Sequence, residues 1–251
     1  MLFYFSATGN TKKVANTIAA RIGEVAYDIE SLLHDEKFDF KLRDSERLGF
    51  FAPVYFGSVP EIMVQFIEKL HVKTAENYYG YIVMTYGNIA CAAPQKFVVT
   101  LLKHGISTHA IFGVASVDTF LPMYDIPDGE ARTQVDEQAQ TQTDFIAEQI
   151  TDRTPITHIQ TGQFPQLTSF ALSPLYAVMR KTANFHASES CIGCGKCEKN
   201  CPVKAIDLDE MTKRPHWVSK RCLLCLRCVH HCPVDAIDYR TMTKGKLRFK
   251  I

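Results

Sequence analysis

The sequence predicts an α/β domain followed by a small α+β domain that is rich in cysteine. Apolar runs of strand length alternate with helical patterns over residues 1–117, which is typical of a parallel sheet with helices on both faces. Eight of the nine cysteines then fall into two runs of equal spacing, at 191–201 and 222–232. We expect the first domain at residues 1–155 and the second at 186–251, joined by a linker and interdomain helix at 156–185.

The chain begins with a predicted strand, a polar turn and a helix. Met1–Phe5 is a short apolar run, too brief for a signal peptide or a membrane span. Beyond the turn, Val14, Ile18 and Ile22 recur at helical spacing. The turn between the strand and the helix reads Ser6-Ala7-Thr8-Gly9-Asn10-Thr11.

This turn has the chemistry of an anion site. The N–H groups at the start of a helix lack partners, and the helix dipole favours a negative charge there. The hydroxyls of Ser6, Thr8 and Thr11 can add donors, and Gly9 allows a positive φ and a close approach. The turn therefore predicts a phosphate-binding loop, against the alternative of an ordinary capped turn before a helix.

Further strands and helices continue the alternation. Strands are expected at 25–29, 48–54, 79–85 and within 106–117. Pro60–His71 is predicted to be a helix with proline in its first turn, and Ala92–His104 a helix that Gly105 ends. The turns after the strands at 48–54 and 79–85 each combine an aromatic residue with glycine.

A polar helix at Ala131–Arg153 and a bridging segment separate the sheet from the cysteines. The bridging segment holds an apolar patch, Phe170–Met179, which Pro174 interrupts. The patch is too short to span a bilayer. We expect it to pack between the two domains, and docking on a membrane or a partner is the alternative.

Both cysteine runs read C-x2-C-x2-C-x3-C-P, which is the bacterial iron–sulfur spacing. The residues that follow also repeat, as CPVKAIDL and CPVDAIDY, which predicts two halves that complete each other's site. Zinc sites use cysteine pairs with longer gaps, and disulfides need an oxidising compartment. The spacing therefore predicts two [4Fe-4S] clusters.

Residues 186–251 resemble a bacterial ferredoxin with two [4Fe-4S] clusters. In such ferredoxins the fourth cysteine of each run binds the other cluster. The resemblance implies a first cluster on Cys191, Cys194, Cys197 and Cys232, and a second cluster on Cys222, Cys225, Cys228 and Cys201. His230 and His231 lie inside the second run, and we expect them to be exposed neighbours of a cluster.

Residues 6–11 resemble the phosphate loop of flavodoxins, which reads roughly T/S-x-T-G-x-T and binds the phosphate of FMN. The resemblance implies a flavodoxin-like five-stranded parallel sheet of order 2-1-3-4-5, with FMN beyond the C-terminal ends of the strands. It makes Tyr55, Phe56 and Tyr86 candidates to stack on the flavin ring. The expected FMN site comprises Ser6, Thr8, Gly9, Asn10, Thr11, Pro53, Val54, Tyr55, Phe56, Gly57, Thr85, Tyr86, Gly87 and Asn88.

The whole chain is similar to flavodoxin–ferredoxin fusions of the EFR1-type family of anaerobes, and the segment 116–127 has a counterpart there. We interpret 116–127 as a lid over the flavin edge or a pad between the domains. The resemblance implies a cytoplasmic electron-transfer protein without catalytic residues of its own, which passes electrons between two clusters and FMN and on to partner redox enzymes. The alternatives are a flavin-dependent reductase of a small substrate and a ferredoxin with a flavin-free structural domain.

The net charge of +1 hides a division of charge between the two parts of the chain. Residues 1–185 hold 15 basic and 20 acidic side chains, whereas residues 186–251 hold 13 and 7. The positive part docks either on the negative part or on an acidic redox partner. We expect no nucleic-acid partner and no transmembrane segment, and self-association into a homo-oligomer is left open. Cys91 is expected to be a small buried residue rather than a reactive thiol.

Overall fold

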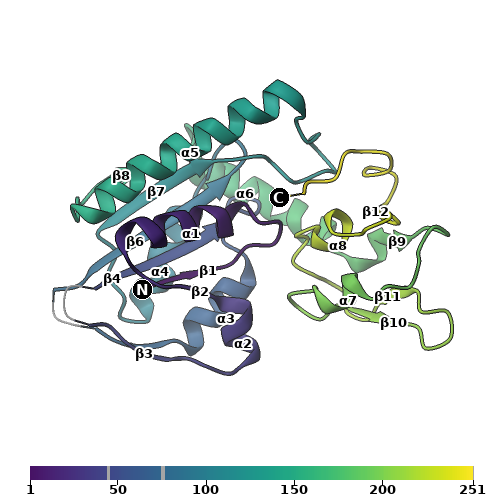
Figure 1. The fold of residues 1–251 in the computed structure, drawn as a ribbon, viewed down its shortest axis with the longest axis horizontal. Helices are drawn as coiled ribbons and strands as arrows, with labels where there is room; N and C mark the ends of the chain where they lie inside the picture. Colours follow the sequence, from purple (N-terminus) through teal and green to yellow (C-terminus); the bar gives the residue numbers. More distant parts are fainter. Residues whose placement is uncertain (44–45, 75–76, 251) are drawn as a thin grey trace.

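The computed structural model describes residues 1–43, 46–74 and 77–250. A six-stranded sheet forms the centre of its N-terminal part (Figure 1). Neighbouring strands all run parallel, in the order β2-β1-β4-β6-β7-β8. The strands are β1 (Leu2–Tyr4), β2 (Ala26–Asp28), β4 (Arg47–Pro53), β6 (Tyr79–Tyr86), β7 (Ala110–Ala115) and β8 (Thr157–His158).

The predicted order of five strands is confirmed, but the predicted number of strands is wrong. β8 adds a sixth strand at the edge, beside β7. Its two residues are exposed and polar, so no apolar run marks it in the sequence. A separate parallel pair, β3 (Asp39–Lys41) and β5 (His71–Lys73), is likewise short, largely exposed and unpredicted.

Helices cover both faces of the sheet (Figure 1). α1 (Asn10–Ile22) and α5 (Gly129–Thr151) share one apolar core with Leu2 and Tyr4 of β1. On the other face, Phe3 and Phe5 belong to the core that covers α2 (Ile29–His34), α3 (Glu61–Lys69) and α4 (Ala93–Lys103). Successive side chains of a strand point to opposite faces, so an apolar strand of this kind is buried on both sides, as predicted.

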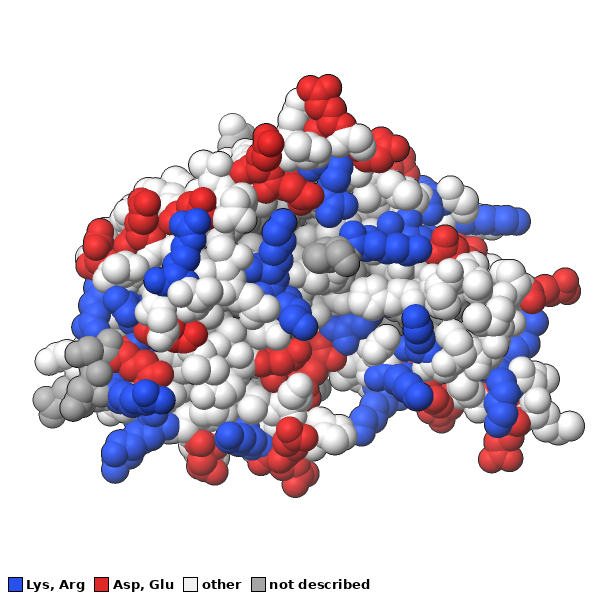
Figure 2. All heavy atoms as spheres, viewed as in Figure 1, with Lys and Arg blue, Asp and Glu red and all other residues white. Residues whose placement is uncertain are grey.

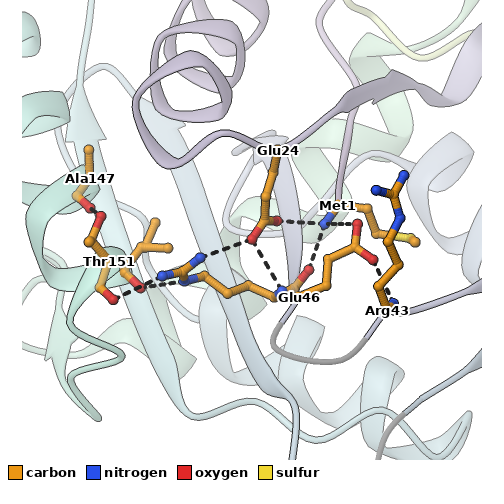
Figure 3. A network of polar contacts seen from close by, with 8 residues as sticks. Met1, Glu24, Arg43, Glu46, Ala147 and Thr151 are labelled. Atoms are coloured by element: carbon orange, nitrogen blue, oxygen red, sulfur yellow. Dashed lines mark hydrogen bonds and ion pairs between the residues drawn. The ribbon is translucent and has the colours of Figure 1, made fainter.

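A polar network lies at the N-terminal ends of the strands (Figure 3). The Met1 ammonium donates to Glu24 Oε2 at 2.5 Å and to Glu46 Oε1 at 3.0 Å. Arg47 donates to Glu24 and, through Nε, to the carbonyl of Ile150 at 2.8 Å. These contacts join β1, β4 and the end of α5, and they leave the carboxyl ends of the strands for the site described below.

The C-terminal part is an α+β unit built from two similar halves, as predicted. β9 (Phe185–Ala187) pairs antiparallel with β12 (Ile237–Tyr239), and β10 (Ile206–Leu208) pairs with β11 (Pro215–Trp217). Each cysteine run contains a short helix, α7 (Lys196–Lys199) or α8 (Arg227–His230). Since its first strand pairs with its last, the two ends of this unit are held together.

α6 (Pro165–Met179) connects the two parts and is followed by the short 3-10 helix η1 (Thr182–Asn184). On its inner side, the Tyr176 hydroxyl donates to the Leu223 carbonyl at 2.9 Å. On its outer side, Phe170 is 79% exposed, and Leu175 and Val178 are exposed as well. The expectation that the apolar patch 170–179 packs between the domains is therefore wrong for this outer side. Within the described residues, no helix has the length and apolar character to cross a membrane.

Candidate cofactor sites

A cavity of about 340 Å³ opens at the carboxyl ends of β1, β4, β6 and β7. It is the place at which ligands bind in doubly wound sheets. Of the fourteen residues that the sequence predicts for the FMN site, all except Gly9 line it. The cavity is also lined by residues 116–120, Met123 and Tyr124, which belong to the segment 116–127 that the sequence predicts as a lid over the flavin edge or a pad between the domains. It has further walls that the sequence did not indicate, at Thr168, Leu172 and residues 224–226.

The predicted phosphate loop closes one end of this cavity. Gly9 precedes α1 with φ 114°, a backbone angle that favours glycine, and its N–H donates to Ser6 Oγ at 3.2 Å. The Thr11 hydroxyl meets the Thr85 hydroxyl at 2.8 Å, and Asn10 Nδ2 donates to the Val117 carbonyl at 2.9 Å. No side chain caps α1, and its first turn carries no acidic residue. The positive end of this helix therefore suits a phosphate group.

The loop after β4 carries two of the predicted ring contacts. Tyr55 and Ser58 exchange backbone hydrogen bonds at 2.8 and 3.0 Å, which places Phe56 and Gly57 at the tip of a tight turn with positive φ. The Phe56 ring stacks on Tyr176 of α6, with centroids 5.0 Å apart. Phe56 therefore lines the cavity, and its ring also packs against Tyr176 of the linker.

Ser169 of α6 holds the same loop in place. Its hydroxyl donates to the Gly57 carbonyl at 3.0 Å and accepts from the Ala92 N–H at 3.0 Å. A Cβ on Gly57 would lie 2.4 Å from this hydroxyl, so only glycine fits there. Because Gly57 and Ser169 are 112 positions apart, this contact could not be predicted from local patterns.

The loop after β6 contributes Tyr86 and Gly87. Tyr86 accepts from the Gln160 N–H at 3.2 Å, so its hydroxyl points toward the chain beyond β8. Gly87 packs so closely against Asp118 that a Cβ on Gly87 would lie 2.3 Å from Asp118 Oδ2. The loops after β6 and β7 are therefore in close contact. Asp118 lines the cavity, and burial raises the pKa of its carboxyl above the ordinary value.

Cys91 also lines the cavity, and it is buried, as expected. Burial raises the pKa of its thiol, with a smaller opposing effect of Lys96. A raised pKa keeps the thiol protonated, whereas a reactive thiol has a lowered one.

The cysteines of the two runs are placed around two separate positions. A small cavity is lined by Cys191, Cys194, Cys197 and Cys232, which is the set implied for the first cluster. Within the described part of the chain, no group of three or more His, Cys, Asp or Glu side chains is placed to hold a single metal ion.

The position of the second set follows from electrostatic contacts. The pKa of Cys222 is raised to about 11 and that of Cys225 to about 12, chiefly by burial and in smaller part by the proximity of Cys201. Cys228 is affected in the same way. Cys201 thus lies near the second run although it belongs to the first, and the crossed ligand sets stay a prediction. The ligand to iron is a thiolate, so the positive iron must compensate for the burial of these sulfurs.

The two halves treat their fourth cysteines alike. The Ala205 N–H donates to Cys201 Sγ at 3.2 Å, and the Ala236 N–H donates to Cys232 Sγ at 3.2 Å. Such N–H···S bonds stabilise thiolates and contribute to the potential of a bound cluster. The two alanines occupy equivalent positions of the repeat CPVKAI and CPVDAI.

His230 corrects one expectation, because it is fully buried rather than exposed. Its Nδ1 accepts from the Phe249 N–H at 3.1 Å, and its Nε2 lies 2.8 Å from the Thr119 carbonyl. This pattern requires a neutral ring with the proton on Nε2. Burial lowers the pKa of His230 to about 4. His231 is exposed, as expected.

Comparison with protein families identifies both parts of the chain. A model named "Flavodoxin domain" matches residues 1–104, and a model named "4Fe-4S dicluster domain" matches residues 190–236. The chain is a flavodoxin–ferredoxin fusion. Its cofactors are FMN and two [4Fe-4S] clusters, and it is a flavin and iron–sulfur electron-transfer protein. The narrower EFR1-type assignment stays a prediction.

Solved structures of similar shape include three bacterial proteins. The rubredoxin oxygen:oxidoreductase of the anaerobe Desulfovibrio gigas is 14% identical over 59% of this chain and 36% of its own, with a TM-score of 0.34. A putative flavoprotein of Bacteroides uniformis is 16% identical over 56% and 96%, with a TM-score of 0.35. General stress protein 14 of Treponema denticola, solved with FMN, is 9% identical over 59% and 97%, with a TM-score of 0.38. This chain thus spans about a third of the length of the first protein. A comparison with curated proteins found no match.

Proposed function

We propose that this protein passes electrons between partner redox enzymes and FMN through its two clusters in series, with the second cluster next to the flavin. The proposal includes the fourteen predicted FMN contacts, the eight cysteine ligands and the domain boundaries 1–155, 156–185 and 186–251. The clusters supply one-electron steps, and FMN, which holds one or two electrons, joins one-electron to two-electron partners.

One observation carries the proposal. Cys225, between Leu224 and Leu226, lines the same cavity as the phosphate loop. The second cluster would therefore border the flavin directly. On the first run, by contrast, Cys194 is exposed and Ile192 is 64% exposed. The first cluster would then lie where a partner protein can reach it.

Charge supports an acidic partner at the first cluster. Lys196 and Lys199 are exposed beside Cys197, and the dicluster part has an excess of basic residues. Figure 2 shows basic side chains over this part, at the right of the view, with acidic ones among them. Opposite charges on a partner would raise the rate of association, and added salt would screen this attraction.

The test starts from anaerobically purified protein with measured iron, sulfide and flavin content. Photoreduction should reduce the clusters first and the flavin afterwards. In Cys194→Ser, which disturbs only the first set, we expect FMN and the second cluster to remain while reduction by an acidic ferredoxin slows. Protein that retains no flavin, or a flavin that never exchanges electrons with reduced clusters, would refute the proposal.

A second candidate function, a flavin-dependent reductase of a small substrate, is favoured by Asp118. A carboxyl with a raised pKa inside the cavity can supply a proton to a bound substrate. Reoxidation of the reduced protein by a panel of quinones, enones and nitroaromatics should be saturable and should slow in Asp118→Asn. If the rate of reoxidation rises linearly with the concentration of each acceptor and is unchanged in Asp118→Asn, the protein acts as a carrier only.

A further inference from the structure

Arg227 connects the second cysteine run to the flavodoxin domain. It lies between Cys225 and Cys228, as the first residue of α8, and its side chain is 11% exposed. The guanidinium forms hydrogen bonds with the other domain. Nε donates to the Ala7 carbonyl at 2.7 Å, and Nη2 donates to the Ser6 carbonyl at 2.6 Å. Both carbonyls belong to the predicted phosphate loop.

The remaining donors of this guanidinium reach two more segments. Nη1 donates to Glu30 Oε2 at 2.7 Å and to the Asn200 carbonyl at 3.0 Å, and Nη2 also donates to Glu30 Oε1. A guanidinium has five N–H donors in a fixed plane, and here each of the five has an acceptor. The side chain can therefore hardly shift without breaking hydrogen bonds.

Three of these acceptor residues, Ser6, Ala7 and Asn200, belong to segments that would hold the flavin or the second cluster. Asn200 immediately precedes Cys201, the crossing ligand of the second cluster, while Arg227 itself stands between two other ligands. Ser6 and Ala7 line the flavin cavity. One planar group thus holds both ligand segments of the second cluster and the phosphate loop in a single geometry.

We propose that Arg227 is a positioning residue that sets the separation of the second cluster and the flavin, and with it the rate of electron transfer between them. The inference rests on the proposed function. Electron transfer between fixed cofactors falls steeply with distance, so a loosened loop slows it even when both cofactors stay bound. A lysine would keep the charge but offer no planar fork, which separates the effect of geometry from that of charge.

Arg180 offers a matched control. Its Nε donates to the Cys222 carbonyl at 2.9 Å, and its other nitrogens pair with Glu61 of α3. It therefore also links the second run to the flavodoxin domain. No hydrogen bond of Arg180 reaches the phosphate loop among the described contacts.

The experiment compares Arg227→Lys and Arg227→Gln with Arg180→Lys. Iron, sulfide and flavin content establish which cofactors are bound. Fluorescence titration of flavin-depleted protein gives the Kd for FMN, spectroelectrochemistry gives the cluster potentials, and flash photoreduction gives the rate of flavin reduction by the clusters.

For Arg227→Lys we expect wild-type iron content, a cluster potential close to wild type, and a Kd for FMN raised by about tenfold, the effect of about 1.4 kcal/mol. The transfer rate should fall by about tenfold or more, and Arg180→Lys should stay within about twofold of wild type. A wild-type rate and Kd in Arg227→Lys would overturn the inference. Loss of the second cluster in both Arg227 variants would also overturn it, because Arg227 would then serve assembly. If the wild-type protein itself shows no transfer, the proposed function fails instead.

Discussion

Leu226 offers a test of how the second cluster loop is built. It precedes α8 with φ 56° and ψ 13°, a left-handed conformation that costs a residue with a side chain roughly 1–2 kcal/mol. Its side chain is 2% exposed and lines the flavin cavity. The equivalent residue of the first run is Gly195, with φ 72° and ψ 0°. We infer that Leu226 tolerates backbone strain because its buried side chain packs in the apolar core beside the flavin cavity.

Two substitutions at this position separate strain from packing. Leu226→Ala removes the buried side chain and keeps the strain, so it should destabilise the protein by about 2–5 kcal/mol. Leu226→Gly removes both and should be more stable than Leu226→Ala by about 1 kcal/mol. In ordinary helix or strand positions the order is reversed, because glycine is the less stable of the two. The sign of the difference is therefore the result that matters.

The assay is thermal denaturation of the cluster-loaded protein under anaerobic conditions at one scan rate. A difference of about 1 kcal/mol should shift the midpoint by about 2–4 °C in a chain of this size. Gly195→Ala is the control, since a Cβ there meets only Leu208 Cδ1 at 3.4 Å, an ordinary contact. It should lower stability by about 1 kcal/mol through strain alone. If Leu226→Ala proves as stable as Leu226→Gly, the strain argument is refuted.

Three further predictions concern other parts of the chain. Because burial raises the pKa of Asp118, the folded protein holds this proton more tightly than the unfolded chain, so stability should fall as the pH rises from the ordinary pKa toward the raised one. Thermal melts of Asp118→Asn over this pH range should lack that fall. Cys232→Ser should damage the first cluster and spare the second, seen as about half the wild-type iron content, and equal loss of both clusters would contradict the crossed ligand sets. Glu24→Ala should destabilise the protein by about 3 kcal/mol in urea denaturation, because it leaves the Met1 ammonium and Arg47 short of a buried partner, and an effect below about 1 kcal/mol would show the network to be unimportant.

Much of the architecture could be predicted because local patterns determine it. The strand at 48–54 is a continuous apolar run, and the eight cysteines carry their chemistry in their spacing. β8 could not be predicted, because two exposed residues join the sheet only through β7. The role of Ser169 could not be predicted either, because it depends on a hydrogen bond to Gly57, more than a hundred residues away. Contacts of this kind depend on the folded arrangement and leave no periodic signal.

The two cysteine runs, however, differ at equivalent positions in a way that distinguishes their roles. The first run places Gly193, Gly195 and Lys196 where the second has Leu224, Leu226 and Arg227. Gly193 and Leu224 share a positive φ, as do Gly195 and Leu226, so these positions have left-handed backbone in both runs although their side chains differ. In the first run the two glycines only form the turn of the cluster site, and Lys196 is exposed. In the second, the leucines are buried against the flavin cavity and the arginine holds the phosphate loop. Side chains that bulky are unfavourable at left-handed positions unless something covers them. Once the structure shows that these positions are left-handed, the departure of the second run from glycine therefore marks it as the run that faces the other domain.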